Sequence, residues 1–393
     1  MPRMSRPAIV FLVRSLDMGG AERQLVELAK GLHAAGWQVE VITFYASGPL
    51  RGLLDAAGVP VFSLDKRGRW DILCLWKLAR YLRRSRPDIV HGYLPLPNVL
   101  LVLLRPTLRT RVVWGIRASN MDLEHYDWLS RIEFRLGAFL SRFADLIICN
   151  SNAGRVYHVA RGYPHATTVV VPNGISLEHF RPDAAARTEM RREWGIRNDE
   201  YVIGIVARLD PMKDHSNFLR AAAHVIQSRT DVRFVCIGDG PVGYRRWLEA
   251  LATSLGLHAR VLWVNARPDV WRVYNALDVA VLSSAFGEGF PNVVAESMAT
   301  GVPCVVTDVG DAATVVANQG YVCSPGDSTA LARAILRALE ATPWDPAAVR
   351  ARIASQYSVQ ALHERTATRL VALLEARANA EPLPPGSAIR RDI

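Results

Sequence analysis

Short apolar runs of strand length alternate with longer stretches of helical spacing along almost the entire chain. In the first half the apolar runs occupy residues 8–13, 39–44, 59–64, 88–91, 111–116, 145–149 and 168–171. In the second half they occupy residues 201–207, 232–237, 260–264, 278–282, 303–307 and 320–322. This alternation is typical of βαβ units, and it predicts an α/β fold with two Rossmann-like domains, each built on an open parallel sheet.

A stretch rich in proline, glycine and charge separates the two series of strands and fits no strand period. We therefore expect a first domain over residues 1–172, a linker over 173–198 and a second domain over 199–360. Helical sequence over 361–378 follows, and it is a candidate to pack back on the first domain. The composition of residues 381–393 is typical of a disordered tail.

The composition excludes several classes of protein. Of the 393 residues, 50% are hydrophobic and 21% are charged, which excludes a disordered chain or a coiled coil. The longest uninterrupted apolar runs, 9–13 and 99–104, are far shorter than the roughly 20 residues of a membrane-spanning helix. The first run ends at Arg14 without a cleavage site of small residues, so the start of the chain reads as cytosolic. The five cysteines have no C-x-x-C spacing and read as buried thiols.

The positive charge lies in the first half of the chain. Residues 1–175 hold 23 Lys and Arg against 13 Asp and Glu, whereas residues 176–393 hold 24 of each class. The whole net charge of +10 therefore belongs to the first half. Only four of the 47 cations are lysine, which fits a general preference for arginine but does not explain the asymmetry.

One basic segment, residues 66–86, has aromatic residues mixed into it. The sequence KRGRWDILCLWKLARYLRRSR combines Trp70, Leu73, Trp76 and Tyr81 with Lys77, Arg80, Arg83 and Arg84. This composition suits an interfacial helix that faces anionic lipid. A helix that faces the core and has a solvated basic side is an equal alternative.

Ligands of open parallel sheets bind at the carboxyl ends of the strands, so chemistry is expected in the loops that follow them. The first such loop is MGGAERQLVELAKGL, in which Gly19 and Gly20 lead directly into a helix. Glycines there let backbone N–H groups approach a phosphate. A tight turn between strand and helix is the plainer interpretation, and the segment is not the G-x-G-x-x-G fingerprint of a dinucleotide site.

The corresponding loop of the second half is VARLDPMKDHSNFLRA, which carries Arg208 and Lys213. Two cations in a short loop between strand and helix can hold a pyrophosphate and offset the charge that develops as it leaves. Lys213 is the only lysine of the second half. A solvated loop is the alternative interpretation.

The most informative segment is SSAFGEGFPNVVAESMATGVPCVVTD. A strand ends, Glu288 follows in a glycine-flanked loop, Pro291 is expected in a first helical turn, and Glu296 lies about one turn into the helix. The loop acid can reach the distal end of a ligand, the helical acid can reach nearer its base, and the amides of residues 290–293 form an anion site between them.

Four segments carry a resemblance to a known family: GGAE, VARLDPMKD, EGFPNVVAE and VPNGI. Together they resemble the retaining family 4 glycosyltransferases, which have the GT-B fold, and the resemblance covers residues 8–377. It implies that Arg208 and Lys213 hold the diphosphate of a nucleotide sugar and act in catalysis with Glu288, which binds the donor sugar. Glu296 would bind the ribose.

The resemblance implies further donor contacts. Gly19 and Gly20 would bring backbone amides from the opposite domain, and the 265–270 loop, NARPDV, would carry the base. The donor site would be completed by Arg267, Gly289, Phe290, Pro291, Asn292 and Val293. His91, Arg117 and Asn173 are the candidates on the acceptor side.

The sequence departs from the family pattern at three places. Arg117 stands where many members have a histidine close to the reacting carbon. Asn265 stands where a glycine is usual, and VGDAAT replaces a Gly-Gly and acidic pattern after the next strand. The first departure concerns the acceptor side, and the other two concern the base and loop geometry.

The resemblance implies transfer of a sugar from a nucleotide-diphosphate sugar, with UDP favoured and GDP possible, to an acceptor hydroxyl with retention of configuration. No cofactor and no metal are expected, and no Asp-x-Asp motif is present. The basic first half favours a lipid-linked saccharide acceptor, an anionic membrane surface as partner, and a cytoplasmic protein at the inner face of the membrane.

Two alternatives remain at the level of the sequence. A sugar-nucleotide epimerase of the same architecture would bind the same donor without transferring the sugar. A basic nucleic-acid-binding protein would explain the charge, but no helix-turn-helix, zinc or RNA-recognition signature accompanies it, so nucleic acid is not an expected partner.

Overall fold

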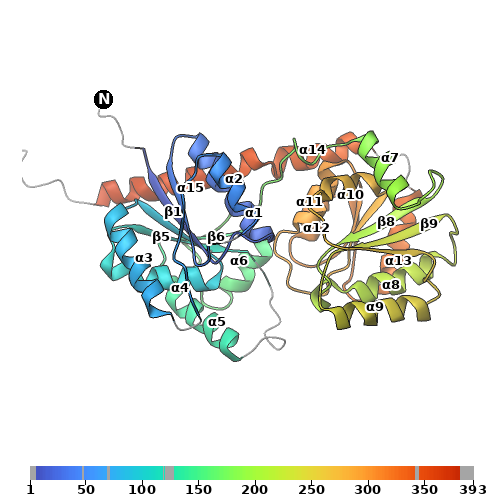
Figure 1. Cartoon of the computed structure of the whole chain (residues 1–393), viewed down its shortest axis with the longest axis horizontal. Coiled ribbons are helices and arrows are strands. Elements are labelled where there is room, and N and C mark those ends of the chain that lie inside the picture. The colour runs from blue at the N-terminus through green and yellow to red at the C-terminus, as the bar shows by residue number, and fades with distance from the viewer. Residues whose placement is uncertain are drawn as a thin grey trace, which may run out of the picture.

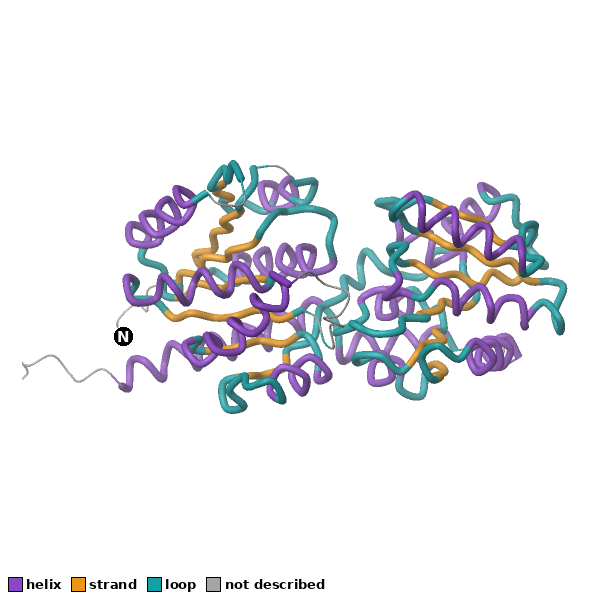
Figure 2. Tube along the Cα trace, turned by 90° about the horizontal axis from the view of Figure 1, so that it is seen from below, coloured by secondary structure: helices purple, strands orange, loops and turns teal. Residues whose placement is uncertain are grey.

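The structure, a computed structural model, describes residues 6–46, 48–68, 71–117, 119, 128–340 and 345–380. Within these residues it has two open sheets side by side, each covered by helices on both faces (Figures 1 and 2). The two parallel-sheet domains predicted from the strand periodicity are therefore confirmed. Trp70 and the expected tail over residues 381–393 lie outside the described residues.

The first domain contains, in its described part, a seven-stranded parallel sheet in the order β3-β2-β1-β4-β5-β6-β7. Each strand lies within two residues of its expected position. The strands are β1 (Ala8–Val13), β2 (Gln38–Thr43), β3 (Val61–Ser63), β4 (Ile89–Tyr93), β5 (Arg111–Ile116), β6 (Leu146–Cys149) and β7 (Thr168–Val170).

Alternate residues of these strands pack against two different sets of helices, because successive side chains of a strand point to opposite faces. Ile9 and Phe11 pack on the side of α1, whereas Val10 and Leu12 pack on the side of α3 and α4. The helices of this part are α1 (Gly20–Ala34), α2 (Arg51–Ala56), α3 (Ile72–Ser85), α4 (Pro95–Leu104), α5 (Trp128–Leu140) and α6 (Asn152–Val159).

The second domain has, as far as it is described, a six-stranded parallel sheet in the order β10-β9-β8-β11-β12-β13. Its strands are β8 (Tyr201–Val206), β9 (Val232–Ile237), β10 (Val261–Val264), β11 (Val279–Leu282), β12 (Cys304–Thr307) and β13 (Gly320–Cys323). Its helices are α7 (Ala184–Glu193), α8 (His215–Val225), α9 (Val242–Ser254), α10 (Val270–Ala276), α11 (Asn292–Ala299), α12 (Ala312–Val316), α13 (Ser328–Glu340) and α14 (Pro346–Gln356).

The chain passes between the domains twice, and the two passages are hydrogen-bonded to each other. Ile175 N donates to the carbonyl of Tyr357 at 2.7 Å, and Val359 N donates to the carbonyl of Ile175 at 3.1 Å. Helix α7 lies inside the stretch expected as a linker, and it contacts α10 of the second domain. The part of that stretch before α7 carries the connection.

The last helix, α15 (Val359–Ala380), returns to the first domain and lies along it (Figure 1). It contacts α1, and its buried residues Leu362 and Leu370 join the core on that face of the sheet. Among the described helices, none is long and apolar enough to cross a membrane.

Candidate functional site

The order of the strands brings the predicted motifs together. In each sheet the connections reverse direction at one point, between β1 and β4 in the first and between β8 and β11 in the second. Ligands of such sheets bind in the crevice that this reversal leaves at the carboxyl edge. The loop after β8 carries Arg208 and Lys213, and the loop after β11 carries Glu288, so both loops lie at this crevice.

Lys213 and Glu288 form the centre of the site. The Nζ of Lys213 lies 2.5 Å from Oε1 of Glu288, and the hydroxyl of Ser284 donates to the same oxygen at 2.6 Å. Glu288 is only 6% exposed, so this carboxylate has exchanged most of its water for these two donors. Two residues predicted from separate motifs are therefore in direct contact.

Backbone contacts fix the position of the lysine. Lys213 ends a short 3-10 turn, η4 (Pro211–Lys213), whose start is capped by Asp210 through the amide of Met212. The hydroxyl of Ser283 donates to the carbonyls of Lys213 and Asp214, at 2.8 and 3.0 Å. The loop after β8 is thus attached to the end of β11, which keeps the lysine beside the acid.

Arg208 has a different environment from Lys213. Its side chain is 69% exposed and pairs with Asp210 at 2.9 Å within its own loop. An exposed arginine keeps most of its hydration, so this pair contributes little to stability and leaves the guanidinium available to a ligand anion.

Glu296 lies on α11 and is held from both domains. The hydroxyl of Tyr274 donates to its Oε2 at 2.8 Å, and the guanidinium of Arg23 on α1 lies 3.7 Å from its Oε1. Burial, followed by the charge of Glu296, raises the pKa of Tyr274 well above its usual value, so the phenol remains a donor. The acid expected to bind ribose is thereby oriented toward the junction of the domains.

The N-terminus of α11 lies between the two glutamates. Pro291 takes the N-cap position, one residue before the expected first helical turn, and no side chain caps the helix. The positive end of the helix dipole therefore remains available, as the expected anion site requires. Phe290 is buried and packs edge-on against Tyr357, and Val293, which is half-buried, packs against the same core.

The first domain also lies close to Asn292, the first residue of this helix. A Cβ on Gly20, the first residue of α1, would lie 3.0 Å from the side-chain amide of Asn292. Asn173 donates to Oδ1 of Asn292 at 2.8 Å. A Cβ on Gly19 would instead meet the carboxylate of Glu22 at 1.9 Å, so this glycine makes room for a neighbouring side chain.

Arg117 follows β5, at the place where the resembled family has a histidine. Its guanidinium lies 4.3 Å from the ring centre of Tyr93 and donates to Oδ1 of Asn173 at 3.2 Å. Through Asn173 it is linked to Asn292 of the second domain. The structure thus brings Arg117, Asn173 and α11 together at the junction.

His91 has a different position from the other acceptor-side candidates. It is fully buried in β4, with ring centres 5.3 Å from Phe11 and 4.9 Å from Tyr93. Burial, assisted by the charge of Arg117, holds the pKa of His91 well below its usual value, so the ring is neutral in the core. Its contact with an acceptor stays a prediction, and this burial disfavours it.

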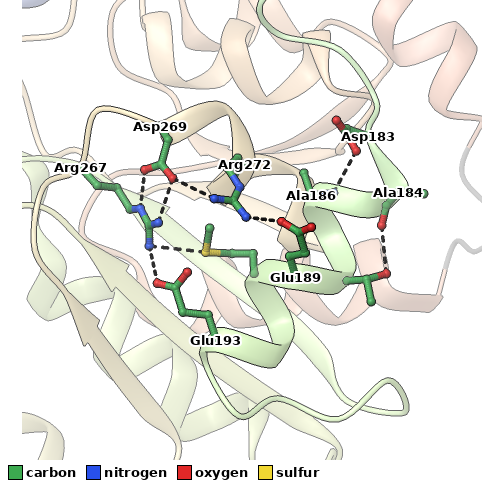
Figure 3. A network of polar contacts seen from close by, with 10 residues as sticks. Asp183, Ala184, Ala186, Glu189, Glu193, Arg267, Asp269 and Arg272 are labelled. Atoms are coloured by element: carbon green, nitrogen blue, oxygen red, sulfur yellow. Dashed lines mark hydrogen bonds and ion pairs between the residues drawn. The ribbon is translucent and has the colours of Figure 1, made fainter.

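Arg267 is directed toward α7 (Figure 3). Its guanidinium binds both carboxylate oxygens of Asp269 at 2.6 and 2.8 Å, and Glu193 of α7 at 2.8 Å. Hydrogen bonding to these acids raises its pKa, which reinforces the ion pairs. The side chain anchors α7, and a contact with the base stays a prediction.

The loop expected to carry the base has other attachments. The side chain of Asn265 accepts a hydrogen bond from Arg245 at 2.6 Å, and Ala266 N donates to Asp239 at 3.1 Å. The unusual Asn265 therefore ties the loop to α9 through its side chain.

Sequence reasoning missed several residues of the site. Ser284 lies four residues before Glu288 and two residues after the end of β11, so a hydroxyl close to a strand end was the available signal. Tyr274 and Arg23 have no local pattern that links them to Glu296, from which they are separated by 22 and 273 positions. Asp311 and Ser119 also cross the junction to backbone groups of the opposite domain.

Comparisons with known proteins agree with this architecture. Residues 18–179 match the family model described as Glycosyltransferase Family 4, and residues 186–355 match the model described as Glycosyl transferases group 1. The chain is 30% identical to EpsF of Bacillus subtilis (strain 168), a protein named as a glycosyltransferase, over 77% of this chain and 80% of EpsF.

Two further similar proteins have a substrate or a bound ligand given in their names or descriptions. The chain is 26% identical to UDP-Gal:alpha-D-GlcNAc-diphosphoundecaprenol alpha-1,3-galactosyltransferase of Escherichia coli, over 74% of this chain and 77% of that enzyme. The crystal structure of Anabaena HepE in complex with UDP-glucose superposes with a TM-score of 0.82 at 26% identity, over 93% of this chain and 99% of HepE. These similarities favour sugar transfer over the epimerase and nucleic-acid-binding alternatives, and the chain belongs to the family 4 glycosyltransferases of the GT-B fold.

Proposed function

We propose that this glycosyltransferase moves a hexose from a UDP-sugar to a hydroxyl of a lipid-linked saccharide, with retention of configuration and without a metal ion. The observation that carries the proposal is the contact between Lys213 and Glu288 at the crevice of the second sheet. This contact supports the proposal because, in the proposed site, a cation for the leaving diphosphate would lie beside an acid for the sugar hydroxyls.

In the proposed reaction the bond between the anomeric carbon and the diphosphate oxygen breaks, and a bond from that carbon to the acceptor oxygen forms on the same face. The acceptor proton passes to the departing diphosphate. Lys213, Arg208 and the N-terminus of α11 stabilise the negative charge that develops on this leaving group. Glu288 orients the sugar, so that catalysis consists of positioning and electrostatic stabilisation.

A UDP-sugar is the favoured donor, and a GDP-sugar is the second candidate. HepE is described with UDP-glucose, and the name of the Escherichia coli relative specifies UDP-galactose. A panel of UDP-, GDP- and ADP-sugars added to the pure protein tests this choice by thermal stabilisation. We expect the largest rise in melting temperature with a UDP-sugar, and no rise with any member of the panel would contradict the proposal.

The proposed acceptor is a saccharide on a lipid carrier, as in the assembly of cell-surface polysaccharide. The name of the Escherichia coli relative includes a diphosphoundecaprenol acceptor. Transfer of labelled sugar to a lipid-linked N-acetylglucosamine diphosphate, compared with the free sugar, tests this assignment. Equal transfer to the free sugar would move the acceptor to a water-soluble molecule.

A lipid-linked acceptor requires a surface that meets the membrane, and we propose α3 as its centre. Cys74, Leu78 and Leu82 of this helix pack in the core. On the opposite side Leu73 is 71% exposed and Trp76 is 58% exposed, and Arg80 lies over the ring of Trp76 at 5.0 Å. Lys77, Arg83 and Arg84 are exposed on the same helix.

The two sequence interpretations of this segment are therefore compatible with each other, since the helix has both a core face and a basic aromatic face. Tyr81 belongs neither to the exposed apolar side chains nor to the exposed cations of α3. Its ring stacks on that of Phe62 with 4.7 Å between the ring centres, and its hydroxyl donates to Glu40 at 2.8 Å. Helices α4 and α5 cover the same side of the sheet (Figure 1). They present the exposed side chains of Leu103 and Phe139. This side of the first domain, at a bilayer, would combine apolar side chains with cations.

A further inference from the structure

Asp311 makes a contact across the junction that the proposed reaction does not use. The residue follows β12 and lies 6% exposed between the two domains. Its Oδ2 accepts a hydrogen bond from Asn152 N at 2.7 Å, and its Oδ1 accepts one from Ala153 N at 2.9 Å. Both donors belong to the first turn of α6, so a carboxylate of the second domain occupies a helix N-terminus of the first.

The contact is favourable for two reasons. The first N–H groups of a helix have no partner within the helix, and the positive end of the helix dipole attracts a carboxylate. The helix already has its own cap, because the hydroxyl of Ser151 accepts from Gly154 N at 3.0 Å. Asp311 satisfies two of the remaining donors, with the charge that strengthens such bonds.

In the described part of its own domain, the side chain of Asp311 makes no hydrogen bond, and both of its oxygens accept from the first domain. Asp311 stands at the N-cap of α12, but its side chain makes no capping hydrogen bond there. Its backbone is fixed independently, since Asp311 N donates to the carbonyl of Gly289 at 3.0 Å and Val315 N donates to the carbonyl of Asp311 at 2.9 Å. Replacing the carboxylate therefore leaves these local bonds in place.

The same backbone contacts attach Asp311 to the loop that carries Glu288. Gly310 has φ +64°, and a Cβ there would lie 2.4 Å from the carbonyl of Glu288. From the other side, a Cβ on Gly289 would lie 2.7 Å from Oδ1 of Asn150 in the first domain. The hydroxyl of Ser119 donates to the carbonyl of Glu288. The Glu288 loop is thus held between residues 310–311 and the loops of the first domain.

We propose that Asp311 is a positioning residue: its carboxylate clasps the N-terminus of α6, keeps the two domains closed, and so holds the Glu288 loop against the first domain. The residue lies in VGDAAT, the segment that departs from the family's Gly-Gly pattern. The expected effect on the donor KM rests on the proposed function, whereas the closure itself does not.

Small-angle X-ray scattering of the full chain tests closure without any substrate. Asp311→Ala and Asp311→Asn should increase the radius of gyration, because the alanine removes both acceptors and the amide replaces one acceptor by an NH₂ group facing a donor. Asp311→Glu should recover most of the closed form. Asp308→Asn, at an exposed position in the same loop, is the control with the same charge change and should scatter like the wild type.

Kinetics with the UDP-sugar that gives the largest thermal shift form the second readout. In these variants a smaller fraction of the protein molecules would be closed and able to bind the donor. The donor KM should therefore rise about tenfold in Asp311→Ala and Asp311→Asn, with kcat nearly unchanged at saturation. A radius of gyration equal to that of the wild type in both variants, or a loss confined to kcat, would refute the proposed role of Asp311. If the wild type transferred no sugar, the proposed function would be wrong, but the scattering experiment would still show whether Asp311 keeps the domains closed.

Discussion

Lys213 and Glu288 are 75 positions apart in the sequence, and their charged atoms lie 2.5 Å apart. Lys213 is the only lysine of the second half of the chain, and Glu288 is the acid of the loop after β11. An ammonium group has three donors, so Lys213 can bind Glu288 and still offer two N–H groups to a diphosphate. In the proposed reaction the pair would therefore give the diphosphate and the sugar adjacent positions in one site.

Replacing Glu288 tests the centre of the site. In Glu288→Gln the amide keeps the size of the side chain and a contact for Ser284, but it loses the charge that faces Lys213. We expect sugar transfer to fall at least about 10²-fold, the scale of losing one preorganised polar group. Thermal denaturation should remain cooperative, and Glu340→Gln, at an exposed position on α13, should retain full activity. Near-wild-type turnover of Glu288→Gln would refute its assignment.

Lys213 and Arg208, the two cations proposed to act in the reaction, should differ in their contribution to stability. Lys213→Ala leaves the buried Glu288 without its counter-charge, and breaking such a pair costs about 3–5 kcal/mol of unfolding free energy. Arg208→Ala removes an exposed side chain and should leave the melting temperature nearly unchanged. Both variants should lose at least about 10²-fold in kcat.

A double variant provides the control for this prediction. Lys213→Met combined with Glu288→Gln removes both charges, so its melting temperature should be higher than that of Lys213→Ala. A rise in donor KM with unchanged kcat in either single variant would contradict the proposed role of that cation in stabilising the leaving group. That pattern means that the residue binds the ground state and the transition state equally well.

Transfer should not depend on a divalent metal, because Lys213, Arg208 and the α11 N-terminus supply the positive charge in the proposed reaction. We expect initial rates with the best donor to stay within about twofold after dialysis against EDTA, well below the effect expected for an essential ion. Loss of activity with EDTA that magnesium or manganese restores would contradict the metal-free proposal.

The buried His215 predicts a pH dependence of stability. Burial, followed by the nearby charge of Lys213, lowers the pKa of His215 from 6.5 to about 4 in the folded protein. The folded state then binds fewer protons than the unfolded state, so this contribution is complete above pH 6.5 and is lost as the pH falls toward 4. The loss can reach about 3 kcal/mol.

Chemical denaturation between pH 7 and pH 4.5 measures this effect. His215→Gln should flatten the decline in unfolding free energy over this range. His258→Gln, at an exposed position of the same domain, should leave the decline unchanged. An identical decline in wild type and His215→Gln would show that other groups determine the acid sensitivity.

The basic face of α3 should bind anionic vesicles. Each basic residue near the surface contributes about 1 kcal/mol, so Arg80, Arg83 and Arg84 replaced together by glutamine should weaken binding strongly. Trp76→Ala tests the apolar contribution. Salt should release the protein, because the Debye length falls from about 10 Å at 0.1 M to about 3 Å at 1 M.

A matched control changes the same charge on the other domain. Arg192, Arg246 and Arg333 are exposed in the second domain, and their replacement by glutamine should leave vesicle binding intact. Binding that is equal for neutral and anionic vesicles, or absent for both, would contradict the proposed membrane contact. The positive charge of the first half would then be a solvated arginine-rich surface.

The strands and their loops could be predicted from the sequence because each depends on local information. Strands buried on both faces appear as short continuous apolar runs, and glycine and proline mark their ends. The loops that carry Lys213 and Glu288 were therefore found separately. Their contact follows from β8 and β11 being neighbours, and strand order is a tertiary property that no local pattern contains.

The partners of single side chains could not be predicted for the same reason. Arg267 lies in the expected base loop, but its bonds to Glu193 depend on how α7 packs. Trp76 and Tyr81 were grouped by composition, whereas five helical positions rotate a side chain by roughly 140° and place one in solvent and the other against Phe62. Periodicity indicates faces, and packing decides what covers them.

The return of α15 to the first domain has a consequence for the order of folding during synthesis. The core on the α1 face of the first sheet includes Leu362 and Leu370, which the ribosome makes more than 180 residues after β7. Until then that face lacks part of its cover and exposes apolar surface. The first domain therefore completes its core only after the whole second domain has been translated.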